Sequence, residues 1–195
     1  MIKQMTTQLT EFLTFEQYDW QKQIGDLCKI YDGRKIDLLY DPYGNIGKSI
    51  LAEYLEYYDL GYELPPYRMM DDIFQWVCGI PPQKAYLVDM PRGMKKDKLG
   101  DFYSGLEVIK NGTAFDKRYK PKKIRFNRPR IFVFTNTLPC FKFMSLDRWN
   151  VWEIDEQKKL NIYTPNTQKT ISKCNIILQE EFNPLHSDEE SDFTE

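Results

Sequence analysis

The sequence lacks the features that mark exported proteins, membrane-spanning proteins and small domains held together by zinc or disulfides. No apolar run approaches the roughly 18 residues that a membrane-spanning helix needs, and the N-terminus has no apolar stretch typical of a secretory signal. The four cysteines are scattered without a paired short spacing, which argues against a zinc site and against a disulfide framework. These absences predict a soluble intracellular protein whose thiols are reduced.

A strong overall charge is also lacking, but the charges are unevenly distributed. The formal net charge is −2, although residues 187–195 hold five acids and no base, a composition that predicts a disordered tail. By contrast, the segment from Arg92 to Arg130 holds 13 Lys and Arg against four acids. Such a basic segment is suited to contact phosphates, and a solvated surface that keeps the protein soluble is the alternative.

The length and the apolar pattern predict one compact α/β domain. The chain has 195 residues, of which 42% are hydrophobic, enough for a core of ordinary size. Short apolar runs typical of buried strands lie at 36–40, 85–88, 131–135 and 151–154. Helical spacing of apolar residues is found at 14–31, 50–58 and 70–77. We therefore expect a central, mostly parallel sheet flanked by helices, preceded by a small N-terminal helical segment, with sites at the carboxyl ends of strands.

The strongest motif is a glycine-containing loop between an expected strand and an expected helix. Its residues are Gly44, Asn45, Ile46, Gly47, Lys48 and Ser49. Glycines allow successive backbone N–H groups to turn toward a phosphate, and the positive end of the next helix favours the same anion. Lys48 is placed to reach the β and γ phosphates, and the Ser49 hydroxyl to bind Mg²⁺. Although Pro42 replaces the usual first glycine, the motif predicts a P-loop NTPase over the alternative, a structural turn.

Asp89 follows the apolar run at 85–88, where an NTPase places the carboxylate that holds Mg²⁺ through water. A surface aspartate at a strand end is the alternative. Met90 and Pro91 come next, where many motors carry a second acid that polarises the attacking water. The identity of the catalytic base therefore stays open, with Glu107 as one candidate.

Asn136 follows the apolar run at 131–135, an expected strand beside the phosphate loop. A side-chain amide offers both a donor and an acceptor, so it suits the orientation of the attacking water or the sensing of the γ-phosphate. An ordinary turn asparagine is the alternative. Its place in the chain, after the lysine loop and Asp89, favours the role in the site.

The order of these motifs resembles the superfamily 3 helicase domain of replication initiators from circular single-stranded DNA viruses of the circovirus-like group. The resemblance covers roughly residues 17–155. It rests on Trp20-Gln21, on Asp41 to Ser49 as motif A, Tyr86 to Arg92 as motif B, Leu106 to Gly112 as motif B′, Phe132 to Asn136 as motif C, and Ser145 to Trp149 as the segment with an arginine finger.

The resemblance implies an ATPase of the AAA+ kind that requires Mg²⁺ and assembles into a homo-oligomeric, hexameric ring. It implies a helicase that translocates along single-stranded DNA with 3′-to-5′ polarity during viral rolling-circle replication, in the nucleus where the host is a eukaryote. It also implies that Arg148 is offered to the γ-phosphate bound by a neighbouring subunit. A salt bridge of Arg148 with Asp147 or Glu153 is the alternative.

In this family a hairpin between motifs B and C projects into the pore of the ring. Lysines and arginines there neutralise phosphates, and an aromatic ring can stack on bases. The resemblance thus places near the DNA strand the residues Lys110, Lys117, Arg118, Tyr119, Lys120, Lys122 and Lys123.

A nicking endonuclease built on two metal-binding histidines and a tyrosine usually accompanies this helicase, whereas the chain has a single histidine, His186. We expect no nicking by that chemistry, and either the helicase portion of a longer protein or a shorter relative. Two alternatives stay open: an RNA helicase of the picornavirus type, and a nucleotide-binding oligomerisation module without efficient turnover. The expected parts are an N-terminal oligomerisation segment (1–35), the ATPase core (36–158), a C-terminal extension (159–186) and the acidic tail (187–195).

Overall fold

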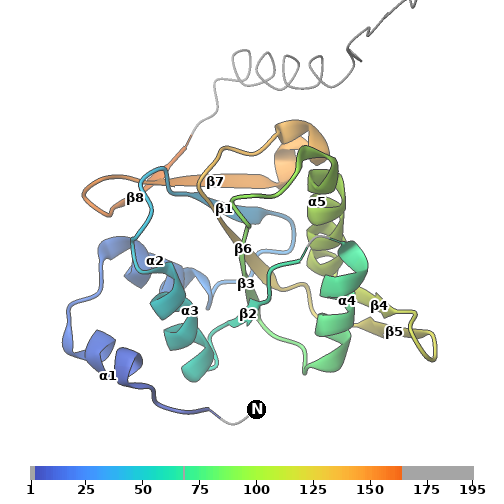
Figure 1. The fold of residues 1–195 in the computed structure, drawn as a ribbon, viewed down its shortest axis with the longest axis horizontal. Helices are drawn as coiled ribbons and strands as arrows, with labels where there is room; N and C mark the ends of the chain where they lie inside the picture. Colours follow the sequence, from blue (N-terminus) through green and yellow to red (C-terminus); the bar gives the residue numbers. More distant parts are fainter. Residues whose placement is uncertain (1–2, 68, 164–195) are drawn as a thin grey trace, which may run out of the picture. The chain divides into compact units, whose positions relative to one another are not determined.

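The computed structural model describes residues 3–67 and 69–163, and within these ranges the fold is built on a six-stranded sheet of order β2-β3-β6-β1-β7-β8 (Figure 1). The strands are β1 (Ile36–Tyr40), β2 (Tyr62–Leu64), β3 (Ala85–Asp89), β6 (Arg130–Thr135), β7 (Trp149–Ile154) and β8 (Leu160–Ile162). All neighbouring strands are parallel except β7 and β8, which are antiparallel. The predicted mostly parallel sheet is confirmed.

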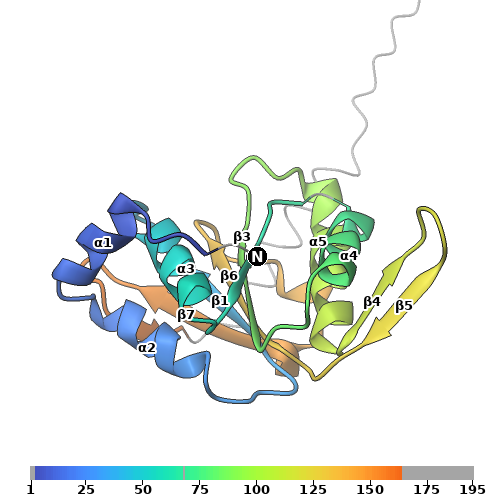
Figure 2. The same cartoon turned by 90° about the horizontal axis from the view of Figure 1, so that it is seen from below.

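Helices cover both faces of the sheet, which explains why the central strands β1, β3 and β6 are buried and mostly apolar (Figure 2). On one side lie α1 (Thr7–Thr14), α2 (Asp19–Leu27) and α3 (Lys48–Tyr57), and on the other lie α4 (Met70–Gly79) and α5 (Lys96–Lys110). Successive residues of a strand point to opposite faces, so Leu38 packs into the core beneath α4 and α5, whereas Leu39 packs beneath α2 and α3.

The N-terminal segment differs from the single helix expected at 14–31, because two helices form with a break between them. The side chain of Thr6 caps α1 by accepting from the N–H of Leu9, and that of Gln21 accepts from the N–H of Tyr18 at the start of α2. Trp20 of α2 is fully buried in the same core as the central strands. The segment 1–35 is therefore partly integral to the sheet domain, and its role in oligomerisation stays a prediction.

The connection from α5 to β6 contains a hairpin of β4 (Thr113–Asp116) and β5 (Lys122–Arg125), seen at the right of Figure 2. Gly112 precedes β4 with a positive φ of 75°, and a Cβ at this position would lie 2.3 Å from the carbonyl oxygen of Phe126. Only glycine fits this close approach. The hairpin between motifs B and C, expected from the resemblance, is thus present.

Between β6 and β7 the chain makes two short 3₁₀ turns, η1 (Phe141–Phe143) and η2 (Leu146–Arg148). The expected core boundary at residue 158 falls inside the β7–β8 pair, so the sheet extends beyond it. His186, the acidic tail and most of the predicted C-terminal extension lie outside the described residues. None of the helices in the described ranges is long and apolar enough to cross a membrane.

Candidate nucleotide-binding site

The predicted phosphate loop lies at the carboxyl edge of the sheet, between the end of β1 and the start of α3. Three of its residues have left-handed backbone conformations: Gly44 has a φ of 75°, Asn45 of 53° and Gly47 of 83°. Glycine adopts this region without steric cost, and asparagine tolerates it better than most residues. A run of such residues before a helix N-terminus makes a concave set of backbone N–H groups that suits a phosphate.

The side chain of Asp41 binds backbone groups of this loop. Its side chain is fully buried, and Oδ1 accepts from the backbone N–H groups of Tyr43 at 3.1 Å and Gly44 at 2.8 Å. Nζ of Lys48 lies 3.5 Å from Oδ2, and this oxygen has no hydrogen-bond partner among the described residues. The carboxylate thus holds both the loop and the lysine that was predicted to contact phosphates, and it already engages the N–H of Gly44.

Asn136 connects the end of β6 to the loop. Strand β6 pairs with β1 on one side and with β3 on the other, so the expected position beside the phosphate loop is confirmed. The Nδ2 group of Asn136 donates to the carbonyl oxygen of Asp41 at 2.7 Å, and Oδ1 accepts from Nε of Arg92 at 3.0 Å. Both ends of the amide are therefore engaged by protein groups. Sequence reasoning did not single out Arg92.

The two predicted magnesium ligands are both exposed at this edge. Asp89 ends β3, and Ser49 lies in the first turn of α3. The described residues contain no group of three or more His, Cys, Asp or Glu side chains that could hold a metal ion. Mg²⁺ in phosphate-transferring sites is commonly held by one or two protein oxygens together with phosphates and water. A site built on Ser49 and Asp89 alone suits that pattern and stays a prediction.

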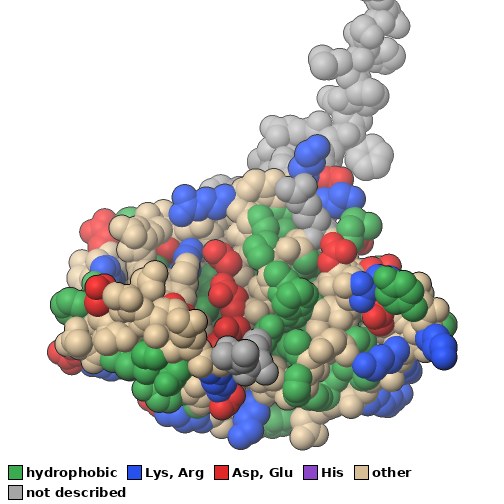
Figure 3. All heavy atoms as spheres, turned by 60° about the horizontal axis from the view of Figure 1, so that its bottom comes forward, with side chains coloured by type: hydrophobic (Ala, Val, Ile, Leu, Met, Phe, Trp, Pro, Cys, Tyr) green, Lys and Arg blue, Asp and Glu red, His purple; other side chains and the backbone are tan. Residues whose placement is uncertain are grey.

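An acidic group beside Asp89 was not found from the sequence. Glu63 of β2 lies opposite Leu87 in the neighbouring strand, and Glu56 of α3 accepts from the N–H of Glu63 at 2.7 Å. Burial raises the pKa of Glu63, and the charges of Glu56 and Asp89 raise it further. Figure 3 shows acidic side chains gathered in the middle of one face of the molecule. The signal was weak because β2 has only three residues.

Glu107 and Arg148, predicted as candidate base and arginine finger, bind each other. Nε of Arg148 lies 2.8 Å from Oε1 of Glu107, and only 9% of Arg148 is exposed. Arg148 directly precedes β7, whose first residue is in register with the first residue of β1, so the pair lies at the amino edge of the sheet. Glu107 is thus not a base for a nucleotide at the carboxyl edge. Arg148 thus forms a salt bridge, as the alternative predicted, but its partner is Glu107 and not Asp147 or Glu153. The role of Arg148 as an arginine finger stays a prediction, and it requires the salt bridge with Glu107 to break.

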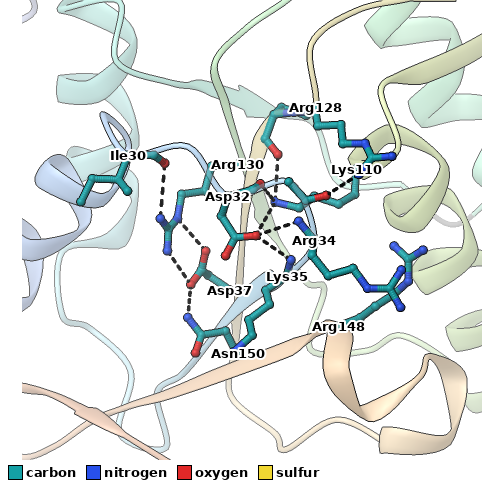
Figure 4. Close-up of polar contacts among 12 residues, drawn as sticks. Ile30, Asp32, Arg34, Lys35, Asp37, Lys110, Arg128, Arg130, Arg148 and Asn150 are labelled. Carbon is teal, nitrogen blue, oxygen red and sulfur yellow. Dashed lines mark hydrogen bonds and ion pairs between the residues drawn. The ribbon is translucent and has the colours of Figure 1, made fainter.

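The predicted DNA contact of Lys110 is wrong, because this lysine is fully buried. Its Nζ donates to the carbonyl oxygens of Asp32 at 2.7 Å and Pro129 at 3.0 Å (Figure 4). Burial, which penalises the charged form, lowers the pKa of Lys110 to about 8. Its position at the end of α5 turns it inward to bind two carbonyl groups from distant parts of the chain, so it is a structural residue.

The remaining predicted DNA contacts are on the β4–β5 hairpin. Tyr119 in its turn is 91% exposed, and Lys120 beside it is exposed as well. The other basic side chains are exposed but have partners within the chain. Lys117 pairs with Asp71 at 3.6 Å, Arg118 with Asp116 at 3.0 Å, Lys122 donates to the carbonyl of Cys78 at 2.9 Å, and Lys123 lies over the ring of Phe115.

Comparison with known proteins relates this chain to viral and alphasatellite replication proteins. It is 31% identical to Para-Rep C3 of the Milk vetch dwarf C3 alphasatellite over 140 residues, which is 70% of this chain and 48% of that protein. It is 26% identical to the master replication protein of Subterranean clover stunt virus (strain F) over 141 residues, 72% of this chain and 47% of that protein. The chain therefore spans about half the length of these relatives. No family model matches it.

These relatives support the resemblance to replication proteins of circular single-stranded DNA viruses on which the motif assignments rest. Replication proteins of two kinds, from alphasatellites and from viruses, match at similar identity, so the likeness does not depend on one group.

Proposed function

We propose that this chain is the ATP-hydrolysing motor domain of a replication protein, and that it moves along single-stranded DNA. The observation that carries the proposal is the convergence of three elements at one edge of the sheet. The left-handed loop with Lys48, the exposed Asp89 at the end of β3 and Asn136 at the end of β6 come from neighbouring parallel strands and the helix that follows β1.

The chemistry of these groups matches phosphoryl transfer. The loop and Lys48 would bind the phosphates, and Ser49 and Asp89 would hold Mg²⁺, which would supply positive charge beside the transferred phosphoryl group. Because little covalent chemistry is left for the protein, catalysis depends on positioning and electrostatics. The acid that polarises water lies on another element than β3, since Met90 and Pro91 follow Asp89.

The choice of DNA rests on the relatives and on the hairpin. The matched proteins are replication proteins, and the exposed Tyr119 and Lys120 offer one stacking ring and one cation to a single strand. In this proposal the chain assembles into a ring as part of a longer initiator, and each hairpin faces the enclosed strand. The superfamily 3 and AAA+ assignments belong to the same proposal.

The deciding experiment is steady-state phosphate release with ATP and Mg²⁺, alone, with single-stranded DNA and with single-stranded RNA. We expect turnover that DNA stimulates. Stimulation by RNA in place of DNA would identify an RNA motor, and nucleotide binding without turnover under all three conditions would identify an oligomerisation module. Sedimentation in the same buffers reports whether ATP and DNA promote assembly.

A further inference from the structure

A guanidinium lies over the phosphate loop. Arg92 follows β3 by three residues, is exposed, and donates from Nε to Oδ1 of Asn136 at 3.0 Å. A Cβ added to Gly44 would lie 3.0 Å from Nη2 of Arg92. A side chain at position 44 would therefore crowd the guanidinium, and the glycine makes room for it beside the left-handed part of the loop.

The orientation of Asn136 fixes this arrangement. Its Nδ2 group donates to the carbonyl oxygen of Asp41 at 2.7 Å, and a carbonyl can only accept. The Oδ1 atom must therefore face the other way, toward Nε of Arg92, which can only donate. Asn136 ties the loop, the end of β6 and the Arg92 segment together, so we regard it as a positioning residue for the guanidinium.

The charge of Arg92 is not neutralised within the described residues. None of the ten ion pairs found among the described residues includes Arg92, whereas the other basic groups near the sheet edges, such as Lys48 and Arg148, each face a carboxylate. An arginine keeps its proton at all physiological pH values, and its fork of donors matches the oxygens of a phosphate. An uncompensated guanidinium at the mouth of an anion-binding loop is therefore a group that recognises negative charge.

We propose that Arg92 binds the terminal phosphate of the nucleotide held by its own chain, and that Asn136 positions it for this contact. The inference rests on the proposed function, because it assumes that the loop binds ATP. It names an arginine that acts within one subunit, in contrast to Arg148, whose guanidinium is buried against Glu107.

The test compares a triphosphate with a diphosphate. Binding of ADP and of the non-hydrolysable analogue adenylyl imidodiphosphate is measured with Mg²⁺ for the wild type, Arg92→Gln, Arg92→Lys and the control Arg128→Gln. Arg128 is an exposed arginine that donates to the carbonyl of Gly33, near the amino edge of the sheet. We expect Arg92→Gln to weaken triphosphate binding by about 10-fold to 100-fold, the value of a hydrogen-bonded charge, and to change ADP binding by less than about 3-fold.

The variants also separate binding from structure. Arg92→Lys keeps the charge and should retain part of the preference for the triphosphate, whereas Arg128→Gln should retain all of it. Asn136→Ala should lower the preference in the wild-type background and have little further effect in Arg92→Gln, because both changes remove the same contact.

Two results would overturn the inference. If the wild type binds the triphosphate but Arg92→Gln weakens both nucleotides equally, or neither, Arg92 is a structural bridge and only this inference fails. If the wild type binds neither nucleotide, the proposed function fails together with it. Thermal unfolding of each nucleotide-free variant shows whether a loss of binding reflects a loss of fold.

Discussion

Two buried aspartates, four residues apart, show how differently the two edges of the sheet treat charge. Asp37, near the amino edge, accepts hydrogen bonds from Arg130 at 2.8 and 3.1 Å and from Asn150 at 2.6 Å (Figure 4). It also accepts one from Trp152 at 2.9 Å. Among the described residues, Asp41 at the carboxyl edge accepts only two hydrogen bonds, both from backbone N–H groups to one oxygen, and its other oxygen faces Lys48 at 3.5 Å without a hydrogen bond.

The amino edge thus holds a buried aspartate whose network is satisfied, whereas the carboxyl edge, where the proposed nucleotide site lies, holds one whose network is incomplete. A fully satisfied buried network fixes one arrangement of the chain, because every alternative leaves a polar group unpaired in a low-dielectric environment. A partly satisfied one leaves donors and charges that a ligand can engage. Ligands of open α/β sheets bind at the carboxyl ends of the strands, which is where the incomplete network lies.

The largest expected effect is on activity at the carboxyl edge. Lys48→Ala should lower ATP turnover by about 100-fold or more, since in the proposed site the lysine stabilises charge on the transferred phosphoryl group. It should also lower the unfolding free energy, because it leaves the buried Asp41 carboxylate without its cation. Phosphate release and urea unfolding measure the two quantities. The matched control is Lys84→Ala, which removes an exposed lysine before β3 and should behave as the wild type. Normal turnover in a folded Lys48→Ala protein would contradict the assignment of the loop.

The next effect is on stability at the amino edge. Asp37→Ala leaves Arg130, which is 6% exposed, without its carboxylate, and should lower the unfolding free energy by about 3–5 kcal/mol. The control is Asp147→Ala, which removes the exposed pair with Arg34 and should cost less than about 1 kcal/mol. Equal losses in urea unfolding would show that the buried network has no special weight.

A third prediction concerns the pH dependence of stability through Lys110. Its pKa is lowered to about 8, so between that pH and about 10.5 the unfolded chain binds a proton that the folded chain lacks. Stability contributed by this site therefore rises with pH over that window, by about 3 kcal/mol, and is lost as pH falls through 8. The difference in unfolding free energy between the wild type and Lys110→Met isolates the slope. A difference independent of pH would mean that the lysine is not desolvated.

The smallest expected effect is on DNA binding by the hairpin. Lys120→Ala should reduce the slope of log affinity for single-stranded DNA against log salt by about 0.7, the value for one neutralised phosphate. Lys84→Ala serves again as the control, because it removes an exposed lysine that lies before β3 and outside the hairpin. An unchanged slope for Lys120→Ala would leave the hairpin turn a solvated surface.

The sequence by itself determined the features that depend on local chemistry. The apolar runs at 36–40 and 131–135 predicted β1 and β6 because strands buried on both faces need continuous apolar residues. The loop from Gly44 to Ser49 was predicted from glycines whose left-handed conformations are now seen at Gly44 and Gly47. Local signals were weaker for the N-terminal helices. A helix was expected over 14–31, but α2 begins at Asp19, where the side chain of Gln21 accepts from the N–H of Tyr18.

Only the tertiary structure decided which charged residues are available to a ligand. Lys110, Arg148 and Arg92 are all basic residues, and the sequence does not show which of them is free to bind a ligand. In the structure, Lys110 is buried against two carbonyl groups, Arg148 is paired with Glu107, and Arg92 lies over Gly44. The partners come from distant parts of the chain, such as Asp32 for Lys110 and Asn136 for Arg92. The physical reason is that desolvation and ion pairing depend on what packs against a side chain, and that is set by the fold.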